Sequence, residues 1–392
     1  LNVPHLRFPE FSGEWNKYTI NDLATVVGGG TPDTTVKSYW GGDIQWFTPS
    51  EIGKNKYVDF SKRTITRDGL DNSSAKLLPL HTILLSSRAT VGECSIASNE
   101  CTTNQGFQSL IAKQCNIDFL YYLIQTKKKD LIRNACGSTF LEISANEIRK
   151  IKVAVPVQNE QEQIAKLLSL IDERIATQNK IIEDLKKLKS AISKYLFARK
   201  DLLETTICLS NIATLKNGYA FQSGKYNALG KWKILTITNV PGERYINDED
   251  CNCIINLPND IQDHQVLKEG DILISLTGNV GRVSLCKNGN YLLNQRVGLL
   301  QLAKNVNQEF LYQILSSQRF ENSMIACGQG AAQMNIGKGD VENYVLPYSS
   351  NGNNILFAAK ILHSYDECII NELRRLTLLT MQKQYLLTQM FI

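Results

Sequence analysis

Several groups of residues have the types that catalysis or ligand binding uses, but each lacks a part that its chemistry requires. Gly330–Lys338 places two glycines before a lysine, as phosphate-binding loops do. Six residues separate the glycines, however, and Gly339 stands where a Ser or Thr would hold magnesium. Gly28–Gly30 follows an apolar pair, but Thr31–Asp33 begins a turn and not a helix, which argues against a dinucleotide site.

The catalytic sets are incomplete as well. Pro32-Asp33 with Lys37 is weakly similar to the carboxylate clusters of nucleases, but the second carboxylate–lysine element is missing. The chain lacks the Asn-Pro-Pro-aromatic motif with which amino-methyltransferases hold a flipped base. It also has no Ser/His/Asp or Cys/His set in a supporting context. We therefore expect no catalytic activity, and a stand-alone nuclease is the weakest alternative.

The ten cysteines and four histidines do not predict a metal site. A structural zinc site needs about four thiolates or imidazoles, usually in close pairs, and Cys251 and Cys253 form the only tight pair. We expect no metal and reduced cysteines, as in a cytoplasmic protein. No apolar stretch of about 18 residues occurs, and Leu1–Pro4 lacks a signal peptide's charged start, so the expected location is cytoplasmic without a membrane span.

The main feature of the sequence is an internal duplication. The 392 residues suit two domains, and 43% hydrophobic with 21% charged residues indicates globular domains and not disorder. Asn116–Gly137 aligns with Asn307–Gly328 without a gap. Other collinear matches pair Thr82–Ser86 with Asp271–Ser275, Val91-Gly92 with Val280-Gly281, Asn104-Gln105 with Asn294-Gln295, and Asp172-Glu173 with Asp366-Glu367. The chain therefore contains one structural unit twice.

Each half predicts the same α+β order of elements. An amphipathic helix is expected at Phe119–Ala135 and again at Phe310–Ala326, after a region of short strands bounded by Gly, Asn and Pro. Examples of the strands are Ile44–Thr48, Thr82–Ser86, Ile234–Thr238 and Asp271–Ser275. The predicted organisation is an N-terminal arm with a first α+β domain (1–156), a long helix (157–200), a second domain (201–347) and a second long helix (348–392).

Both long helices carry a heptad seam of alternating four- and three-residue steps. The predicted seam positions of the first helix are Ile171, Ile175, Gln178, Ile182, Leu185, Lys189, Ile192 and Leu196. Those of the second helix are Tyr365, Ile369, Glu372, Leu376, Leu379, Lys383, Leu386 and Met390. The polar interruptions fall at equivalent places in the two helices.

These polar positions predict the direction of the helix pair. A parallel register would place Lys189 against Lys383, two like charges in one layer. An antiparallel register instead pairs Lys189 with Glu372 and Gln178 with Lys383, so we predict an antiparallel coiled coil and a pseudo-two-fold body. Residues 171–196 would span about 37 Å, comparable to one turn of B-DNA at about 34–36 Å. A helical hairpin that only joins two domains is the alternative.

Motifs along nearly the whole chain resemble the specificity (S) subunits of type I restriction-modification systems. Val3–Trp15 is similar to the opening P-x-L-R-F-P-x-F-x-x-x-W of that family, and Gly29–Pro32 and Tyr39–Gly41 follow in the family's order. Pro156–Ala165 resembles the proline, acidic and glutamine stretch that leads into its conserved helix. Pro347–Asn354 lacks the Glu-Gln element, which leaves the start of the second helix open.

The resemblance implies a non-catalytic chain that binds double-stranded DNA. Two target-recognition domains would each bind half of a split sequence, and the helices would set the unread spacer. Two modification (M) subunits would dock on the helices and nearby surfaces and use S-adenosylmethionine. Restriction (R) subunits would add ATP- and Mg2+-dependent translocation and cleavage. No cofactor is expected in this chain.

The candidate DNA contacts are chosen by side-chain chemistry, because Arg and Lys suit guanine and phosphate while Asn and Gln suit adenine. All of them lie in turn-rich segments. In the first half they are Lys37, Tyr39, Lys54, Lys56, Arg63, Arg67, Ser87, Arg88 and Thr90. In the second half they are Lys225, Tyr226, Thr277, Asn279, Arg282 and Arg296.

The equivalent segments Ser87–Thr90 and Leu276–Asn279 differ in side chain, as two different half-sites would require. Asn104-Gln105 and Asn294-Gln295 are shared by both halves, which favours a structural role for them. The net charge of +5 is only mild support for nucleic acid. The rival interpretation is a duplicated adaptor that binds protein or polysaccharide ligands.

Overall fold

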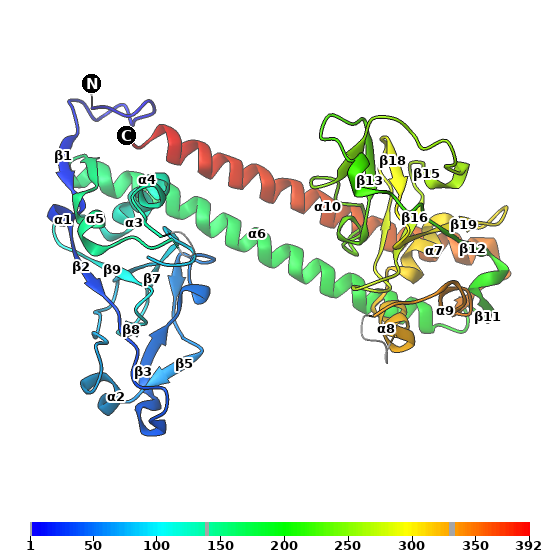
Figure 1. Ribbon diagram of the computed structural model, residues 1–392, viewed down its shortest axis with the longest axis horizontal. Helices are drawn as coiled ribbons and strands as arrows, with labels where there is room; N and C mark the ends of the chain where they lie inside the picture. The colour runs from blue at the N-terminus through cyan, green and yellow to red at the C-terminus, as the bar shows by residue number, and fades with distance from the viewer. Residues whose placement is uncertain (1, 138–140, 329–333) are drawn as a thin grey trace. The chain divides into compact units, whose positions relative to one another are not determined.

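The computed structural model describes residues 2–137, 141–328 and 334–392. It divides into two compact units, which are described separately (Figure 1). Unit 1 comprises Leu1–Asn179 and Arg375–Ile392, and unit 2 comprises Lys180–Arg374. The long helices α6 (Gln158–Ala198) and α10 (Gly352–Gln389) are continuous, so each contributes one segment to either unit.

Unit 1 is built on a five-stranded sheet in the order β2-β9-β6-β7-β4, with a three-stranded sheet β5-β3-β8 and a two-stranded sheet β1-β10. Its strands are β1 (Asn16–Thr19), β2 (Ala24–Gly28), β3 (Trp40–Phe47), β4 (Tyr57–Val58), β5 (Arg63–Ile65), β6 (Ile83–Leu85), β7 (Cys94–Ala97), β8 (Cys101–Thr103), β9 (Gln108–Ala112) and β10 (Lys152–Val155). Its shorter helices are α1 (Ile20–Leu23), α2 (Arg67–Asp71), α3 (Ile117–Thr126), α4 (Lys128–Arg133) and α5 (Ala145–Lys150).

Unit 2 contains two four-stranded sheets, in the orders β12-β19-β16-β17 and β14-β13-β18-β15, and a two-stranded sheet β11-β20. Its strands are β11 (Thr205–Cys208), β12 (Ala213–Asn217), β13 (Trp232–Leu235), β14 (Asn252–Ile254), β15 (Val266–Leu267), β16 (Ile272–Ser275), β17 (Val283–Leu285), β18 (Tyr291–Leu293), β19 (Val297–Leu302) and β20 (Val345–Tyr348). Its shorter helices are α7 (Gln308–Leu315), α8 (Gln318–Gly328) and α9 (Lys338–Glu342).

The central sheet has the same topology in both units. The antiparallel order β2-β9-β6-β7 of unit 1 returns as β12-β19-β16-β17 in unit 2. The parallel pair β3–β8 returns as β13–β18, and the antiparallel pair β1–β10 as β11–β20. The predicted α+β class with a duplicated domain and two long helices is therefore confirmed.

One helix packs against the central sheet at the same place in each unit. The side chains of Asn116 and Asn307 accept hydrogen bonds from the amides of Phe119 and Phe310 at 3.0 and 2.8 Å, so an N-cap begins α3 and α7. Both phenylalanines are buried in the main hydrophobic core of their unit. The duplicated sequence thus forms a duplicated core.

The predicted single helices are each divided in two. The first breaks at Lys127, between α3 and α4, and the second at Ser316-Ser317, between α7 and α8. At each break a hydroxyl donates back to a carbonyl one turn earlier: Thr126 to Leu123 at 2.7 Å and Ser317 to Ile314 at 2.6 Å. Such side-chain bonds compete with the backbone hydrogen bonds of a helix. The spacing of apolar residues, from which the single helices were predicted, contains no information about them.

The predicted seam positions of α6 and α10 are all buried or half-buried. The direction of the pair is antiparallel, because Asp172 pairs with Lys383 in unit 1 and Lys189 pairs with Asp366 in unit 2, at 2.7 and 2.6 Å. The predicted register was wrong. Lys189 pairs with Asp366, six positions before the predicted Glu372, and Lys383 pairs with Asp172, six positions before the predicted Gln178.

The register differs for an electrostatic reason. Asp172 and Asp366 each lie one position after a seam residue. A register predicted from the seam residues alone does not take these neighbouring side chains into account. A carboxylate there accepts a charge-assisted bond from a partly buried ammonium, which a shifted register would leave without that partner. The internal repeat aligns these two aspartates with each other, but it did not predict that they pair with the lysines of the seam.

Candidate nucleic-acid interface

Two equivalent loops carry several of the predicted DNA contacts. Ser86–Gly92 joins β6 to β7 in unit 1, and Ser275–Gly281 joins β16 to β17 in unit 2. In both, the carbonyl of the first residue accepts a hydrogen bond from the amide of the last, at 3.1 and 2.9 Å. Ala89 and Gly278 turn the two tips with positive φ angles of 59° and 69°. One backbone conformation therefore presents two different sets of side chains.

In unit 1 the tip of this loop is polar and accessible. Arg88 is half-exposed and forms an ion pair of 2.8 Å with Glu142. Thr90 is exposed and donates to the hydroxyl of Ser86 at 3.1 Å. Ser87, in contrast, is fully buried below the tip, and its hydroxyl has no hydrogen-bond partner. Arg88 and Thr90 are thus placed to contact a ligand from the tip, whereas Ser87 lies beneath the surface.

In unit 2 the same loop borders a polar groove of about 410 Å³. Its polar lining residues are Asn217, Thr277, Gln295, Asn335 and Lys338. The Thr277 hydroxyl is buried without a hydrogen-bond partner. Hydroxyl and amide groups of this kind can donate to and accept from base edges.

Asn335 and Asn217 are candidate contacts that the sequence did not predict. Glu142 forms a β-bridge with Arg88, and Asn335 forms the corresponding bridge with Thr277. Extending the repeat by this one segment would have identified Asn335. The neighbouring Gly330–Lys338 segment, considered above as a phosphate loop, lies partly outside the described residues; Lys338 begins α9 and pairs with Glu342 at 3.6 Å.

The other predicted contacts of unit 2 lie around this loop. Asn279 is exposed at the tip, and Arg296 is exposed at the neighbouring turn. Arg282 forms a long ion pair of 3.6 Å with Glu321. Lys225 is exposed beyond β12, whereas the ring of Tyr226 packs against a small apolar cluster.

The shared Asn-Gln pairs shape the adjacent turns. The side-chain oxygens of Asn104 and Asn294 accept hydrogen bonds from the amides of Gly106 and Arg296, at 2.8 and 3.1 Å. Each asparagine therefore closes its own turn, which agrees with the structural role predicted for it.

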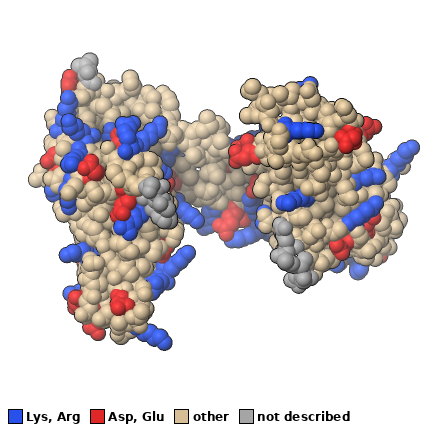
Figure 2. Space-filling model, viewed as in Figure 1, with Lys and Arg blue, Asp and Glu red and all other residues tan. Residues whose placement is uncertain are grey.

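A second group of predicted contacts in unit 1 comes from adjoining segments after β2. Lys37 and Arg67 are exposed there, and Tyr39 accepts a backbone bond from Thr66 next to α2. Figure 2 shows Lys and Arg side chains projecting from this part of unit 1, which carries β3, β5 and α2 in Figure 1. Lys54 is also exposed, but it lies in a different loop, on the wall of the cavity described below.

Arg63 belongs to this group, and an indole supports its side chain. Its guanidinium lies 3.6 Å from the ring centroid of Trp40, which meets the buried Trp46 edge-on at 5.0 Å. The Trp46 indole N–H donates to the carbonyl of Gly30 at 2.9 Å. The two tryptophans therefore support the exposed guanidinium of Arg63 from below.

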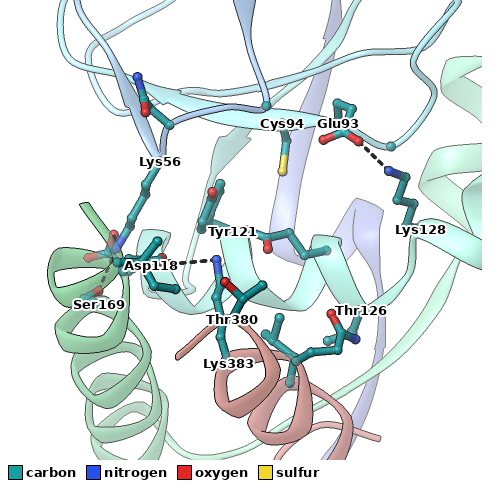
Figure 3. A pocket seen from close by; sticks show the side chains of 18 of the residues that line it. Lys56, Glu93, Cys94, Asp118, Tyr121, Thr126, Lys128, Ser169, Thr380 and Lys383 are labelled. Carbon is teal, nitrogen blue, oxygen red and sulfur yellow. Dashed lines mark hydrogen bonds and ion pairs between the residues drawn. The ribbon is translucent and has the colours of Figure 1, made fainter. Parts of the chain in front are cut away.

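Lys56 is placed differently from the other predicted contacts. Its side chain is only 9% exposed and enters a cavity of about 1230 Å³ within unit 1 (Figure 3). The ammonium pairs with Asp118 at 2.7 Å and donates to Ser169 at 2.6 Å. Cys94 also lines this cavity, and burial raises the pKa of its thiol to about 12, which disfavours the reactive thiolate form.

The N-terminal arm is held by one buried carboxylate. Glu160 at the start of α6 is fully buried and accepts two bonds of 2.8 Å from the Arg7 guanidinium. The Trp15 indole N–H donates to the same carboxylate at 3.2 Å. The hydrogen bonds from Arg7 to Glu160 raise the pKa of Arg7. The arm motif and the glutamine-rich helix start, which are far apart in the sequence, therefore form one joint.

Within the described ranges, no group of three or more His, Cys, Asp or Glu is arranged to hold a metal ion. A search of the same ranges finds no helix with the length and apolar character of a membrane span. Cys251 and Cys253 are free thiols, as are the other cysteines.

Comparison with known proteins gives family and fold. A type I restriction modification DNA specificity domain matches twice, at residues 12–187 and 204–380. The MjaIX specificity subunit of Methanocaldococcus jannaschii is 38% identical over 192 residues, which cover 47% of this chain and 44% of that protein. The EcoR124I/EcoR124II specificity subunit of Escherichia coli is 28% identical over 206 residues, half of each chain.

These matched segments span about half the length of the curated relatives. Among solved structures, the S subunit of a type I restriction-modification system from M. genitalium has a TM-score of 0.58 at 18% identity. That alignment covers 100% of this chain and 99% of the other, so the fold is shared over the whole length. With two matched domains and this fold, the chain belongs to the type I restriction modification DNA specificity domain family.

Proposed function

We propose that this chain is the DNA-specificity subunit of a type I restriction-modification complex, and that each unit binds one half of a split DNA sequence. The observation that carries the proposal is the pair of loops Ser86–Gly92 and Ser275–Gly281. The same backbone bond closes both loops, while Arg88 and Thr90 in one stand where Thr277 and Asn279 stand in the other. Side chains that differ on a shared scaffold are what two different half-sites require.

The proposed partners are modification subunits, with restriction subunits joining the complex. Several large apolar side chains are exposed on the two long helices and support docking there, because exposed apolar surface is a common feature of protein interaction sites. They are Leu170, Ile181, Leu188 and Tyr195 on α6, and Leu378, Met381 and Tyr385 on α10.

In this proposal the chain itself is non-catalytic and binds no cofactor. S-adenosylmethionine, ATP and Mg2+ would serve the partner subunits. The complex would act on cellular DNA, which keeps the cytoplasm as the proposed location.

The test is DNA binding by the chain together with its modification subunit, measured over a range of salt concentrations. The logarithm of the affinity should fall linearly with the logarithm of salt, with a slope of about −0.9 for each phosphate neutralised. One split sequence should bind most tightly, by about 10³-fold or more over unrelated DNA. Methylation-sensitive sequencing of genomic DNA would supply that sequence.

A flat salt dependence without a preferred sequence would refute DNA specificity. The same preparation binding peptides or polysaccharides tightly would then favour a duplicated adaptor. Cleavage or methylation of DNA by the chain alone would contradict the non-catalytic part of the proposal.

A further inference from the structure

A cluster of charged side chains lies between the second domain and the helix pair, within unit 2. Its centre is Asp366 of α10, whose side chain is 8% exposed. This carboxylate accepts bonds from Lys189 of α6 at 2.6 Å, from Gln313 of α7 at 2.6 Å and from Arg244 at 3.0 Å. Asp366, next to the seam, therefore joins the other long helix, the packed helix α7 and the segment that carries Arg244.

Arg244 is the member of this cluster that comes from the recognition part of unit 2. It lies in the segment between β13 and β14, and its side chain is 8% exposed. Its guanidinium contacts both oxygens of Glu309, in the first turn of α7, at 2.9 and 2.7 Å. Burial is the largest single influence and acts to lower the pKa of Arg244, but the hydrogen bonds of its guanidinium and the charges of Glu309 and Asp366 together raise it. The two terminal nitrogens of Arg244 are thus bonded to partners inside the protein, whereas its buried Nε has no hydrogen-bond partner.

Unit 1 contains a cluster of the same design on the wall of its large cavity (Figure 3). Asp172 of α6 accepts from Lys383 of α10 at 2.7 Å and from the Tyr122 hydroxyl of α3 at 2.6 Å. Lys56, from the segment before β4, contacts Asp118 in the first turn of α3 at 2.7 Å. It also donates to Ser169 of α6 at 2.6 Å.

The two clusters use equivalent positions with different side chains. The duplication aligns Asp172 with Asp366. In each unit an aspartate next to the seam pairs with a lysine from the opposite helix, and a cation from the recognition domain contacts an acid in the first turn of the packed helix. The cation is Lys56 in unit 1 and Arg244 in unit 2. The same kind of cation–acid contact therefore occurs in both units, with a different cation and a different acid in each. Its presence in both units indicates a shared role and not a chance pairing.

Partly buried ion pairs are weak evidence for stability, because desolvation offsets much of their attraction. They do favour one geometry, since a small displacement leaves charged groups without partners. We propose that Lys56 and Arg244 are positioning residues that fix each recognition domain on the helix pair, and so restrict the half-site spacing that the protein accepts. This inference rests on the proposed function, and it assigns Lys56 to Asp118 instead of to DNA.

The geometry of DNA makes spacing sensitive to such a restraint. One additional base pair moves a half-site by about 3.4 Å and rotates it by about 34–36° around the DNA axis. A domain held at a fixed angle cannot follow that rotation, whereas a loosely held domain can. Loss of the positioning contacts should therefore broaden the accepted spacing without changing the bases that are bound.

The test uses duplexes that carry the protein's own split sequence with the natural spacer or with one base pair more or less. Two double variants each remove both partners of one contact, which avoids leaving a buried charge unpaired. The first combines Lys56→Met with Asp118→Leu, and the second combines Arg244→Met with Glu309→Leu. Each double variant should reduce the preference for the natural spacer by about tenfold. This ratio corresponds to a coupling energy in the middle of the range found for residues in contact. Lys56→Arg, which keeps the charge, should retain most of the preference.

Matched controls remove exposed contacts near each cluster. Lys186→Met breaks the 3.5 Å pair with Glu243, which joins α6 to the same segment as Arg244. Lys128→Met breaks the pair with Glu93 on the wall of the unit 1 cavity. Both control variants should keep the spacing preference of the parent chain.

A second readout separates positioning from DNA contact. If Lys56 acts as proposed, Lys56→Met with Asp118→Leu leaves the salt slope unchanged. A slope reduced by about one with an unaltered spacing preference would show a phosphate contact and overturn the inference. An unaltered preference in the Arg244 pair would overturn it for unit 2.

Hydrogen exchange without DNA keeps this inference distinct from the proposed function. Amides of residues 239–246 and of the segment around Lys56 should exchange faster in the paired variants than in the controls. If the parent chain binds no split sequence while exchange rises as expected, the proposed function fails but the positioning role stands. Unchanged exchange would refute the positioning role.

Discussion

At the scale of single residues, the two units differ most where their loops project. Arg88 and Thr277 occupy the same place in the repeat and each forms a bridge with the segment that follows the packed helices. Arg88 is paired with Glu142, whereas the Thr277 hydroxyl is left without a partner beside a polar groove. The unit 1 loop therefore offers a cation, and the unit 2 loop offers neutral hydrogen-bonding groups.

We predict that Arg88→Ala weakens binding of one half-site only. The loss should be about 1–3 kcal/mol for the preferred sequence, and discrimination at one base pair of that half-site should relax. Competition binding with duplexes that are altered in one half-site at a time measures this. Arg133→Ala, which removes an exposed residue of α4 in the same unit, is the control. Equal losses at both half-sites would contradict the assignment of one unit to each half.

At the scale of elements, charge decided what apolar spacing left open. The heptad pattern of α6 and α10 predicted which positions face inward, and these positions are buried or half-buried. Similar apolar layers form in several registers, so the pattern alone cannot choose among them. The ion pairs Lys189–Asp366 and Asp172–Lys383 belong to one of these registers.

A double-mutant cycle on the helix pair tests this register. Lys189→Met combined with Asp366→Asn should show a coupling energy of about 0.5–3 kcal/mol in the free energy of unfolding, because the two side chains are in contact. The same cycle with Glu372→Gln should give a smaller value. Denaturant unfolding of the four variants in each cycle measures both energies. A larger coupling with Glu372 would restore the register predicted from the sequence.

The start of α10 depends on a carboxylate from a distant segment. Glu204 accepts hydrogen bonds from the amide and the hydroxyl of Ser350, at 2.7 and 2.9 Å. The bond from the Ser350 backbone is the main cause that lowers the pKa of Glu204 from 4.5 to about 2. This contact supplies a polar partner at a helix start that lacks the Glu-Gln element of the first half.

We predict a defined pH range for the Glu204 contribution. Because the folded pKa is depressed, the ionised carboxylate stabilises the fold above pH 4.5, and this stabilisation is lost as the pH falls from 4.5 to about 2. Glu204→Gln should therefore lower the Tm near neutral pH, and the difference from the parent chain should shrink across that range. Glu249→Gln, at an exposed glutamate of the same unit, is the control. A Tm difference that stays constant with pH would argue against the contact.

At the scale of the whole molecule, the duplication produces two units with separate hydrophobic cores. Leu120 of α3 and Leu311 of α7 are equivalent in the repeat, and each is fully buried in the core of its own unit. The C-terminal segment belongs to unit 1, where Phe391 stacks on Phe119 with ring centroids 5.2 Å apart. Each unit therefore combines residues from distant parts of the chain.

We predict that equivalent core substitutions act on their own unit. Leu120→Ala and Leu311→Ala should each lower stability by about 2–5 kcal/mol through loss of buried area and creation of a cavity. Hydrogen exchange followed by mass spectrometry should show the larger increase within the unit that carries the substitution. Equal increases across both units would show instead that they unfold together.

The sequence by itself determined the duplication, the α+β class, the two long helices and their inward-facing positions. These features depend on periodicity and on repeated residue types, which are local properties of the chain. The tertiary structure decided the helix register, the division of the packed helices and the place of Lys56, because each depends on polar partners that are distant in sequence. Asp118, Ser169 and Asp366 have no distinctive spacing from Lys56, Lys189 or Arg244. Only folding brings these charges together, and the cost of leaving a buried charge unpaired then selects the observed arrangement.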